Sequence, residues 1–355
     1  MSTVIVTGAG GLIGSEAVRH FVKEHRVIGI DNDARASFFG SDASTEWQLR
    51  KLKEEFGPKF VRVNLDITDT TGVEALFSGC RNDIVAVVHC AAQPSHDWAA
   101  KAPHTDFRVN AHGTLNLLEA VRVFTPNAVF VHLSTNKVYG DRPNYLPLIE
   151  KATRFDLPYS DPMFDGVDEQ MSIDHTKHSL FGVSKASADL YVQEYGRYFG
   201  LKTVALRGGC LTGPAHSGTK LHGFLSYLVK CAVTGETYTI IGYGGKQVRD
   251  NIHSADLIEA VDRIVRKPPE PGTVFNIGGG RENSVSILEA IDTVQHILGV
   301  EMKVEFNPTP RIGDHKWYIT NNRKLMDAYP GWSPKTSVRQ TIEEICEAMK
   351  VRWGK

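Results

Sequence analysis

A glycine-rich segment near the start of the chain has the spacing of a dinucleotide-binding turn. Residues 7–14 read Thr-Gly-Ala-Gly-Gly-Leu-Ile-Gly, which places glycines at Gly8, Gly11 and Gly14. Backbone N–H groups at the start of a helix can bind a pyrophosphate, because these groups and the helix dipole attract negative charge. A side chain on Gly11 would block that approach, and one on Gly14 would push the helix off the preceding strand. The segment therefore predicts a bound dinucleotide.

Asp31 indicates which dinucleotide binds. It ends the next apolar run, 17 residues after Gly14. A carboxylate at that point accepts hydrogen bonds from the adenosine ribose hydroxyls and repels a 2′-phosphate, so it favours NAD over NADP. Arg35 lies close by in sequence and keeps NADP open as the other cofactor. A glycine turn without a ligand and a solvated aspartate form the alternative, which the strand–turn–helix context disfavours.

The elements that must position these residues form an alternating pattern. Helix-like stretches, such as 113–123 and 185–199, lie between short apolar runs without clean polar alternation, which are typical of parallel strands covered on both faces. This order predicts an α/β fold, a doubly wound parallel Rossmann sheet with right-handed crossovers. The expected strands are 4–6, 27–30, 60–63, 84–89, 128–133, 203–206 and a returning strand at 273–277.

Composition excludes several other classes of protein. The 355 residues include 40 Lys and Arg against 41 Asp and Glu, and this balance disfavours nucleic-acid binding. No apolar run is long enough to cross a bilayer, and the N-terminus has no signal-peptide pattern. The five cysteines are scattered and lack Cys-x-x-Cys spacing. They indicate reduced thiols in a cytoplasmic protein, without a disulfide framework and with no metal site.

Several further motifs give the chain a resemblance to a known family. With the glycines and Asp31, the chain resembles an extended short-chain dehydrogenase/reductase of the NAD-dependent epimerase/dehydratase family. Within that family it is most similar to the CDP-tyvelose (CDP-paratose) 2-epimerases. The motifs are His89-Cys-Ala-Ala-Gln93, Asn110, Ser134-Thr-Asn-Lys-Val-Tyr-Gly-Asp141, Lys185, Gly245-Lys-Gln-Val-Arg-Asp250 with His253, Phe275-Asn-Ile-Gly-Gly279 and Gly331-Trp-Ser-Pro-Lys335.

The resemblance implies catalysis by transient hydride transfer. NAD takes a hydride from a carbinol carbon of a nucleotide sugar, a base takes the hydroxyl proton, and the hydride returns to the opposite face. The cofactor is regenerated in each turnover. The residues expected to bind NAD are Gly8, Gly11, Leu12, Ile13, Gly14, Asp31, Asn32, Asp66, Ile67, Ala91, Ala92, Gln93, Asn110 and Lys185.

Phe181 departs from the family at its catalytic base. The base is the tyrosine of a Tyr-x-x-x-Lys pair, whose spacing places both side chains on one helix face. In the family, the Lys ammonium and the nicotinamide charge lower the pKa of that tyrosine. Here residues 179–185 read Ser-Leu-Phe-Gly-Val-Ser-Lys, so Phe181 occupies the tyrosine position while Lys185 remains. Phenylalanine has no proton to exchange.

Three explanations for Phe181 stay open. In the first, the enzyme is active with another base. Lys185 is the first candidate, because burial and a nearby cationic nicotinamide both lower the pKa of an ammonium group. The other candidate bases are His96, His178, Lys137 and Cys210. In the second, Phe181 is an engineered substitution in an active fold. In the third, the chain binds its ligands without turnover.

Thr135 matches the family's Ser or Thr that hydrogen-bonds the reacting hydroxyl. A hydroxyl group can donate to a keto oxygen and accept from an alcohol, which suits both half-reactions. In the 4,6-dehydratases of this superfamily an acidic pair follows it, whereas here Asn136 and Lys137 follow it. Neither side chain can supply the acid that expels a hydroxyl group. This disfavours a dehydratase.

A nucleoside diphosphate sugar is the expected substrate. Arginine binds phosphate oxygens through its planar fork, and Arg249 and Arg311 match the family's pyrophosphate contacts. The expected substrate-binding residues are His96, Asn136, Lys137, Gly209, Cys210, His222, Arg249 and Arg311. We expect the NAD-binding domain over residues 1–208, with a return segment at about 248–280. The nucleotide-sugar-binding domain then covers residues 209–247 and 281–355.

The function expected from these features is an NAD-dependent nucleotide-sugar epimerase, most like a CDP-sugar 2-epimerase. The alternatives are a nucleotide-sugar dehydrogenase or ketoreductase that releases NADH, and a catalytically silent regulator that binds NAD or a sugar nucleotide. Many relatives pair through two helices, and the stretches 115–123 and 186–195 would form such a homodimer. No nucleic-acid or membrane partner is expected.

Overall fold

The computed structural model describes residues 1–80, 83–220 and 223–354, and its contacts divide the chain into two compact units. The first unit comprises residues 1–138, 180–207 and 258–275. The second unit comprises residues 139–179, 208–257 and 276–355. Each unit therefore combines segments that are far apart in the sequence.

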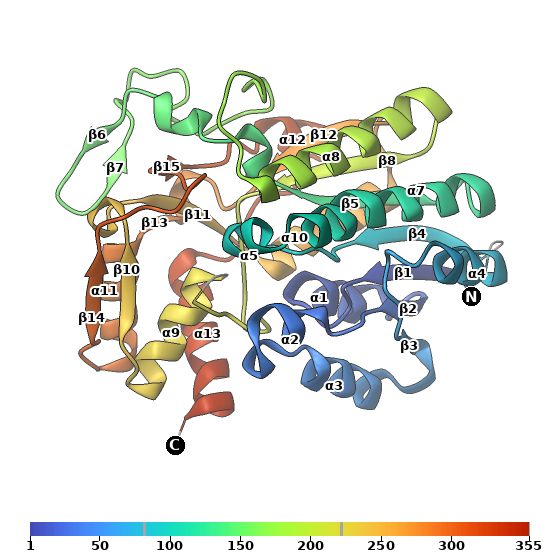
Figure 1. The fold of residues 1–355 in the computed structure, drawn as a ribbon, viewed down its shortest axis with the longest axis horizontal. Coiled ribbons are helices and arrows are strands. Elements are labelled where there is room, and N and C mark those ends of the chain that lie inside the picture. Colours follow the sequence, from blue (N-terminus) through green and yellow to red (C-terminus); the bar gives the residue numbers. More distant parts are fainter. Residues whose placement is uncertain (81–82, 221–222, 355) are drawn as a thin grey trace. The chain divides into compact units, whose positions relative to one another are not determined.

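The first unit is built on a seven-stranded sheet (Figure 1). Its strands are β1 (Thr3–Thr7), β2 (Arg26–Ile30), β3 (Phe60–Val63), β4 (Ile84–His89), β5 (Val129–Thr135), β8 (Thr203–Gly208) and β12 (Thr273–Ile277). The strand order is β12-β8-β5-β4-β1-β2-β3. The pairs β1–β2, β2–β3, β1–β4 and β4–β5 run parallel. The chain starts in the middle of the sheet and extends it in both directions, which confirms the doubly wound fold.

Helices cover this sheet and connect its strands (Figure 1). They are α1 (Leu12–Phe21), α2 (Ala34–Phe39), α3 (Glu46–Phe56), α4 (Thr70–Cys80), α5 (His96–Lys101), α6 (Pro103–Phe107), a π-helical turn (Arg108–His112), α7 (Gly113–Phe124), α8 (Leu180–Phe199) and α10 (Ser254–Arg266). Helix α7 contacts both α4 and α8, and α1 contacts α3. A contact of 3.2 Å between His20 Nε2 and Asp262 Oδ1 joins α1 to α10.

The core of the first unit explains why its strands are almost entirely apolar. All five residues of β1 are buried, because helices cover both faces of the central strands. Side chains from strands and helices meet in one cluster, which includes Ile5, Ile28, Phe77, Leu117, Phe130 and Val192. The helices present one apolar stripe each; in α1, for example, Ala17, Val18 and Phe21 are buried.

The second unit contains smaller sheets and a separate core. Its strands are β6 (Ile149–Glu150), β7 (Phe155–Asp156), β9 (Cys210–Thr212), β10 (Tyr238–Ile241), β11 (Val248–His253), β13 (Ser284–Ser286), β14 (Val304–Asn307) and β15 (Trp317–Tyr318). Strand β11 pairs with β9, β13 and β15, while β10 pairs with β14 and β6 with β7. Its helices are α9 (Phe224–Thr234), α11 (Ile287–Leu298), α12 (Arg323–Ala328) and α13 (Val338–Trp353). Helices α9, α11 and α13 share an apolar core.

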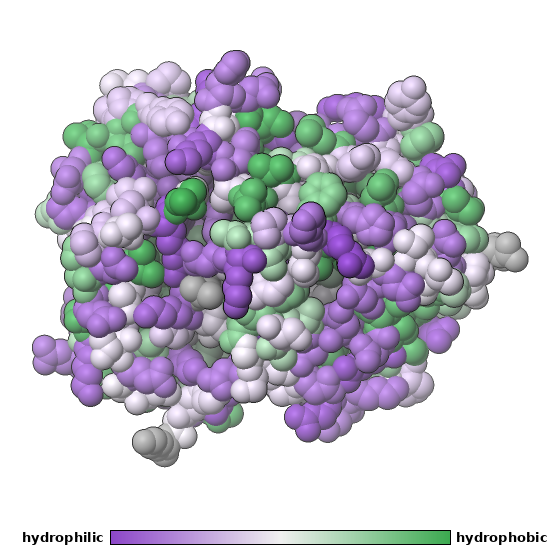
Figure 2. All heavy atoms as spheres, viewed as in Figure 1, coloured by the Kyte–Doolittle hydropathy of each residue, from purple (hydrophilic) through white to green (hydrophobic). Residues whose placement is uncertain are grey.

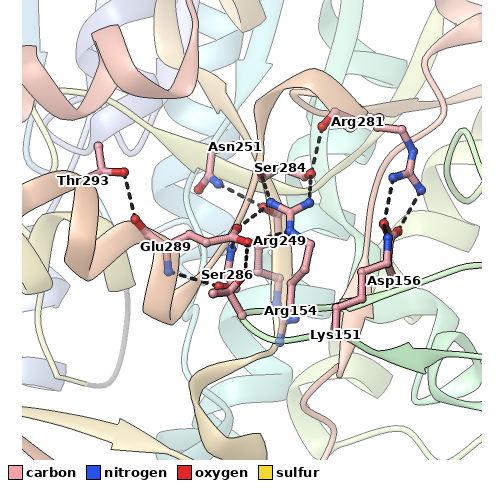
Figure 3. Close-up of polar contacts among 11 residues, drawn as sticks. Lys151, Arg154, Asp156, Arg249, Asn251, Arg281, Ser284, Ser286, Glu289 and Thr293 are labelled. Atoms are coloured by element: carbon pink, nitrogen blue, oxygen red, sulfur yellow. Dashed lines mark hydrogen bonds and ion pairs between the residues drawn. The ribbon is translucent and has the colours of Figure 1, made fainter.

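The division differs from the expected domains in two segments. The sequence predicts residues 139–179 in the NAD-binding domain, whereas they belong to the second unit. The β6–β7 hairpin in this segment is held there by ion pairs from Arg154 to Glu289 and from Arg281 to Asp156 (Figure 3). The return segment is 258–275 instead of about 248–280, because β11 forms its ladders with strands of the second unit.

Polar and apolar side chains are interspersed on the face drawn in Figure 2, where hydrophobic patches are small. Among the described residues, no helix combines the length and apolarity needed to cross a membrane. Within the same residues, no group of three or more His, Cys, Asp or Glu side chains is arranged to hold a metal ion. All five cysteines are free thiols.

A buried ion pair joins α8 to β8 inside the first unit. Asp189 accepts hydrogen bonds from Arg207 Nε at 3.1 Å and from Arg207 Nη2 at 2.8 Å. Both side chains are almost fully buried, and the Asp189 carboxylate also accepts from Ser134 Oγ at the end of β5. The pair therefore fixes α8, β8 and β5 relative to one another.

Asp189→Ala should lower the free energy of unfolding by about 3–5 kcal/mol, because Arg207 would become an unpaired buried charge. Arg266→Ala is the matched control, since its ion pairs with Glu24 and Asp262 involve an exposed guanidinium. Its loss should cost at most about 1 kcal/mol. Chemical denaturation followed by circular dichroism measures both. Equal losses would contradict a special contribution from the buried pair.

Candidate active site

The glycine turn is closed most tightly around Gly8 and Gly14. It joins β1 to α1, and Gly8 has a positive φ of 67°. A Cβ on Gly14 would lie 2.0 Å from the Gly8 carbonyl oxygen, and one on Gly8 would lie 3.0 Å from the Ala91 backbone. The N-cap of α1 is Gly11, which offers no side chain to the helix N–H groups, and the first turn holds no acidic residue. These residues fit the pyrophosphate of a dinucleotide, because the N–H groups remain available to it.

Asp31 lies at the carboxyl end of β2, where its carboxylate supports the same turn. It accepts hydrogen bonds from Gly10 N at 2.8 Å, from Asp33 N at 2.8 Å and from Thr45 Oγ1 at 3.3 Å. Burial raises the pKa of Asp31, and the hydrogen bonds oppose this shift. Asp33 stands beside it and accepts from Thr45 N and Ser44 Oγ. Two carboxylates at this point disfavour the 2′-phosphate of NADP.

Arg35 does not act as an isolated cation at this site. Burial lowers the pKa of Arg35 to about 10, and the charges of Asp31 and Asp33 oppose that shift. Its guanidinium also lies 5.2 Å from the centre of the Phe39 ring. The two aspartates therefore already balance its charge, which leaves little attraction for a 2′-phosphate.

The loops after β2 and β3 hold three further residues that are expected to bind NAD, Asn32, Asp66 and Ile67. Asn32 Nδ2 donates to Asp66 Oδ2 at 3.2 Å, which links the end of β2 to the loop after β3. The buried Ile67 accepts from Asn116 Nδ2 through its carbonyl oxygen at 3.0 Å. The loop after β3 is thus fixed to both β2 and α7.

A buried hydrogen-bond network positions the loop after β4. Gln93 N donates to Asn110 Oδ1 at 2.9 Å, and Asn110 Nδ2 donates back to the Gln93 carbonyl oxygen at 3.0 Å. The same nitrogen lies 3.0 Å from Ser184 Oγ and from Asp106 Oδ1. Gln93, Asn110, Ser184 and Asp106 are at most 1% exposed. The loop that holds Ala91, Ala92 and Gln93 is therefore joined to α8 through the π-helical turn.

Lys185 lies on α8, one residue after Ser184, and only 3% of it is exposed. Its Nζ donates to the Leu133 carbonyl oxygen at 2.8 Å and lies 3.4 Å from His132 Nε2. Burial lowers the pKa of Lys185 to about 8, opposed by the interactions with Asp189, Cys90 and Asp106. The ammonium form still predominates at neutral pH. Lys185 is thus a hydrogen-bond donor held against β5.

Three of the groups beside Lys185, His132, His89 and Cys90, remain uncharged. Burial and the Lys185 charge hold the pKa of His132 well below its usual range and lower the pKa of His89 to about 3. Burial also raises the pKa of the Cys90 thiol to about 12. The imidazole of His89 is held by Thr7 Oγ1 at 2.7 Å and by Thr114 Oγ1 at 2.9 Å. Among these four residues, Lys185 is therefore the one that carries a charge.

Phe181 is buried one turn before Lys185, on the same face of α8. Its ring meets the imidazole of His96 edge-to-face, with the ring centres 5.0 Å apart and the planes at 68°. His96 is partly exposed and begins α5, directly after the N-cap Ser95. The structure thus brings together two residues that the sequence singles out separately, the phenylalanine at the expected tyrosine position and one of the candidate bases.

Thr135 ends β5, two residues beyond the carbonyl that Lys185 contacts. Its Oγ1 accepts from Lys137 N at 3.2 Å and lies 3.4 Å from Asn136 Oδ1. Asn136 is buried, and Lys137 follows it in a short 3-10 turn. The three expected residues therefore share one turn in the first unit.

The expected phosphate-binding residues lie in the second unit and already have partners. Arg249, 8% exposed, donates from Nη2 to Asp314 Oδ1 and from Nη1 to the Val248 carbonyl oxygen. Arg311 donates to the Lys220 carbonyl oxygen at 2.9 Å. Figure 3 shows Arg249 on β11 with Asn251, whose amide donates to the Arg249 carbonyl oxygen. Asp314 follows Arg311 by three residues, so one loop supplies both Arg311 and the carboxylate that pairs with Arg249.

Gly209 and Cys210 lie where the chain passes from β8 to β9. Gly209 donates its N–H to the Ile277 carbonyl oxygen, and a Cβ there would lie 2.8 Å from Asp250 Oδ1. Cys210 begins β9, opposite Asn251 of β11. Of the two remaining expected residues, His222 lies outside the residues that the structure describes. His178 belongs to the second unit, where its Nε2 bonds the Ile173 carbonyl oxygen.

Sequence reasoning misses several residues that organise the site. His132, Ser184 and Asp106 contact Lys185 or Asn110, yet no short motif contains all of them. The sequence could have indicated Ser184 and Asp189, because they lie one residue before and four residues after Lys185 on the same helix. The sequence indicates His132 less clearly, because its only unusual feature is an ionisable side chain inside a mostly apolar strand.

The chain is similar to known proteins over most of its length. The model of the NAD dependent epimerase/dehydratase family matches residues 4–278. CDP-paratose 2-epimerase from Salmonella typhi is 31% identical over 352 residues, which cover 96% of this chain and 97% of that protein. A putative UDP-glucose 4-epimerase from Methanocaldococcus jannaschii is 26% identical, covering 98% of both chains.

Solved structures are similar over nearly the whole chain. One is a tyrosine-to-phenylalanine mutant of UDP-glucuronic acid 4-epimerase from Bacillus cereus, in complex with UDP-4-deoxy-4-fluoro-glucuronic acid and NAD. It has a TM-score of 0.79 and 26% identity, and covers 99% of this chain and 100% of that one. UDP-glucose 4-epimerase from Thermus thermophilus with NAD has a TM-score of 0.78 and 27% identity, covering 98% of this chain and 99% of that one.

The chain belongs to the NAD-dependent epimerase/dehydratase family. The similarities also confirm the Rossmann-type α/β fold, the NAD cofactor and the expected class of function, an NAD-dependent nucleotide-sugar epimerase.

Gly14→Ala should abolish the retention of NAD during purification and lower the melting temperature, because its Cβ would meet the Gly8 carbonyl oxygen at 2.0 Å. Gly79→Ala is the matched control, since Gly79 also lies in a helix and its Cβ would have open space. That variant should keep NAD and gain slight stability. Mass spectrometry of the released cofactor and thermal unfolding measure both. NAD retained in Gly14→Ala would contradict the proposed contact.

Proposed function

We propose that this protein is an NAD-dependent epimerase that inverts C2 of a CDP-linked sugar. The support for the nucleotide and the carbon is its 31% identity to CDP-paratose 2-epimerase over nearly the full length of both proteins. The support for the chemistry is the position of Lys185 and Thr135. Lys185 contacts the Leu133 carbonyl oxygen of β5, and Thr135 ends the same strand two residues later.

We propose that different residues of the site bind the cofactor and position the reacting oxygen. NAD, when bound, supplies the acceptor and donor of the hydride. The glycine turn and Asp31 would hold its pyrophosphate and ribose, and Lys185 would present a fixed ammonium group to the cofactor. Thr135 would hold the reacting oxygen, because its hydroxyl can donate to a ketone and accept from an alcohol.

Arg311 and Arg249 are proposed to bind the diphosphate of the substrate. The Asp314 carboxylate neutralises part of the Arg249 charge, so Arg249 would contribute less attraction than its position alone suggests. Gly209 and Cys210 would line the sugar site through their place at the start of β9. The further substrate contacts that we propose are His96, Asn136, Lys137 and His222.

A homodimer is proposed from the first unit. Apolar side chains on α8 are exposed, among them Val183, Leu190 and Tyr191, and Val123 on α7 is also exposed. A surface of this kind on two adjacent helices fits helix pairing between copies. The five free thiols further fit the reducing conditions of the cytoplasm, where we propose that the protein works.

The proposal makes a direct prediction for substrate and cofactor. Incubated with CDP-paratose, the protein should form its C2 epimer without net change at the NADH absorbance band, because the cofactor is regenerated in every turnover. Proton NMR of the sugar and absorbance measure the two quantities. UDP-glucose should react more slowly. A stoichiometric rise in NADH would indicate the dehydrogenase alternative, and bound nucleotide sugar without any product would indicate the silent regulator.

Lys185→Met should lower kcat by at least ~100-fold while the protein stays folded, because methionine keeps the length of the side chain and removes its charge. Lys202→Met is the control, since Lys202 is exposed, its Nζ donates to the Asn127 carbonyl oxygen, and it is not among the proposed site residues. Steady-state kinetics and thermal unfolding measure both variants. Unchanged kcat in Lys185→Met would remove Lys185 from the proposed site.

A further inference from the structure

Because residue 181 has no hydroxyl group, the proton-transfer step of the proposed reaction still needs a residue to perform it. Oxidation of a carbinol carbon requires a group that takes the hydroxyl proton and later returns it. Phe181 has no such group. The alternative bases differ in where the structure places them.

Lys185 is poorly placed to take that proton. Lys185 is buried, its Nζ already donates to the Leu133 carbonyl oxygen, and the same nitrogen lies 3.4 Å from His132 Nε2. Since the pKa of Lys185 is lowered by burial only to about 8, the group remains mostly protonated at neutral pH. A protonated ammonium group can donate a hydrogen bond but cannot act as a base.

His96 lies directly beside the ring that replaces the tyrosine. The two ring centres are 5.0 Å apart, and the 68° angle between the planes is an edge-to-face contact. The Phe181 ring is 6% exposed, whereas His96 is partly exposed. A partly exposed imidazole therefore lies against the ring at the expected tyrosine position.

A buried chain of hydrogen bonds holds His96 and Phe181 in one arrangement. Ser95, the neighbour of His96, donates its N–H to Gln93 Oε1 at 2.6 Å. Gln93 exchanges two hydrogen bonds with Asn110, which contacts Ser184 Oγ at 3.0 Å. Ser184 Oγ in turn donates to the carbonyl oxygen of Phe181 itself at 3.0 Å. These buried groups fix the loop before α5 against α8, so the contact between the two rings is positioned from both ends.

We propose that His96 is the proton-transfer residue of this enzyme, an inference that rests on the proposed function. An imidazole nitrogen takes the proton as the O–H bond of the sugar hydroxyl breaks, while the hydride leaves the same carbon for NAD and a carbonyl group forms. On the return of the hydride to the opposite face, the imidazolium gives the proton back to the oxygen. Proton and hydride are both restored, so the net reaction is an isomerisation. Phe181 provides the apolar wall that orients the imidazole.

Chemistry favours imidazole for this task, because histidine side chains exchange protons near neutral pH without large perturbation. The proposal also explains why a phenylalanine could stand at position 181. A tyrosine base and a histidine base side by side would duplicate the proton-transfer group, whereas a phenyl ring only restricts the orientation of the imidazole.

The test compares His96→Asn with His104→Asn. His104 is an exposed histidine on α6 of the same unit, so the same substitution there should leave kcat unchanged. His96→Asn should lower kcat by about 10²–10⁴-fold. Both variants should retain NAD, measured by mass spectrometry after denaturation, and both should keep the wild-type melting temperature.

Chemical rescue separates proton transfer from a structural role. In His96→Ala, added imidazole should raise kcat by at least ~10-fold, because it replaces the missing proton-transfer group. The double variant His96→Asn with Phe181→Tyr should recover activity through the new phenol. Loss of kcat with neither form of rescue would assign His96 a structural role and overturn the proposal.

The outcomes also separate this inference from the proposed function. Wild-type kcat in His96→Asn, together with wild-type activity that rises with pH up to about 8, would assign the proton to Lys185 instead. A wild-type protein that epimerises no nucleotide sugar would overturn the proposed function and this inference with it.

Discussion

The arrangement of the candidate site depends on the side chain of Asn110. It lies in a single π-helical turn and is 1% exposed, and its amide exchanges two hydrogen bonds with the backbone of Gln93. The same amide reaches Ser184 on α8. One buried amide thus joins the loop after β4 to the helix that holds Phe181 and Lys185. Because a buried polar group without partners is costly, this network tolerates few alternative arrangements.

Burial then sets the charges around Lys185. The imidazoles of His89 and His132 and the thiol of Cys90 lie in the same interior, where desolvation keeps all three uncharged. Desolvation also lowers the pKa of Lys185, while Asp189, Cys90 and Asp106 oppose the shift. The Asp189 carboxylate is shared with Arg207, so it cannot act on Lys185 alone. The balance leaves an ammonium group that is fixed and mostly protonated at neutral pH, a better donor than acceptor.

The second unit is organised around a single strand, β11, which pairs with several short strands. Strand β11 pairs with β9, β13 and β15 and holds Arg249, while Arg154 binds the β6–β7 hairpin to β13 and α11 (Figure 3). Arg249 already pairs with Asp314. The diphosphate binding that we propose for this unit would therefore depend on how the 311–314 loop presents both Arg311 and Asp314.

Local sequence is enough to predict the strands of the first unit and its cofactor, whereas the surroundings of Phe181 and Lys185 become visible only in the folded chain. Gly8, Gly11, Gly14 and Asp31 each sit next to the strand or helix that they serve, and apolar strands covered on both faces lack polar alternation. The expected strands consequently agree with the observed sheet to within a few residues. His96, His132 and Asn110, by contrast, come from three different segments, and no spacing rule connects them to α8. The place of residues 139–179 in the second unit likewise depends on ion pairs from Arg154 and Arg281 across more than a hundred residues of sequence. Local motifs specify a backbone conformation, but side-chain contacts between distant segments form only when the core has brought those segments together.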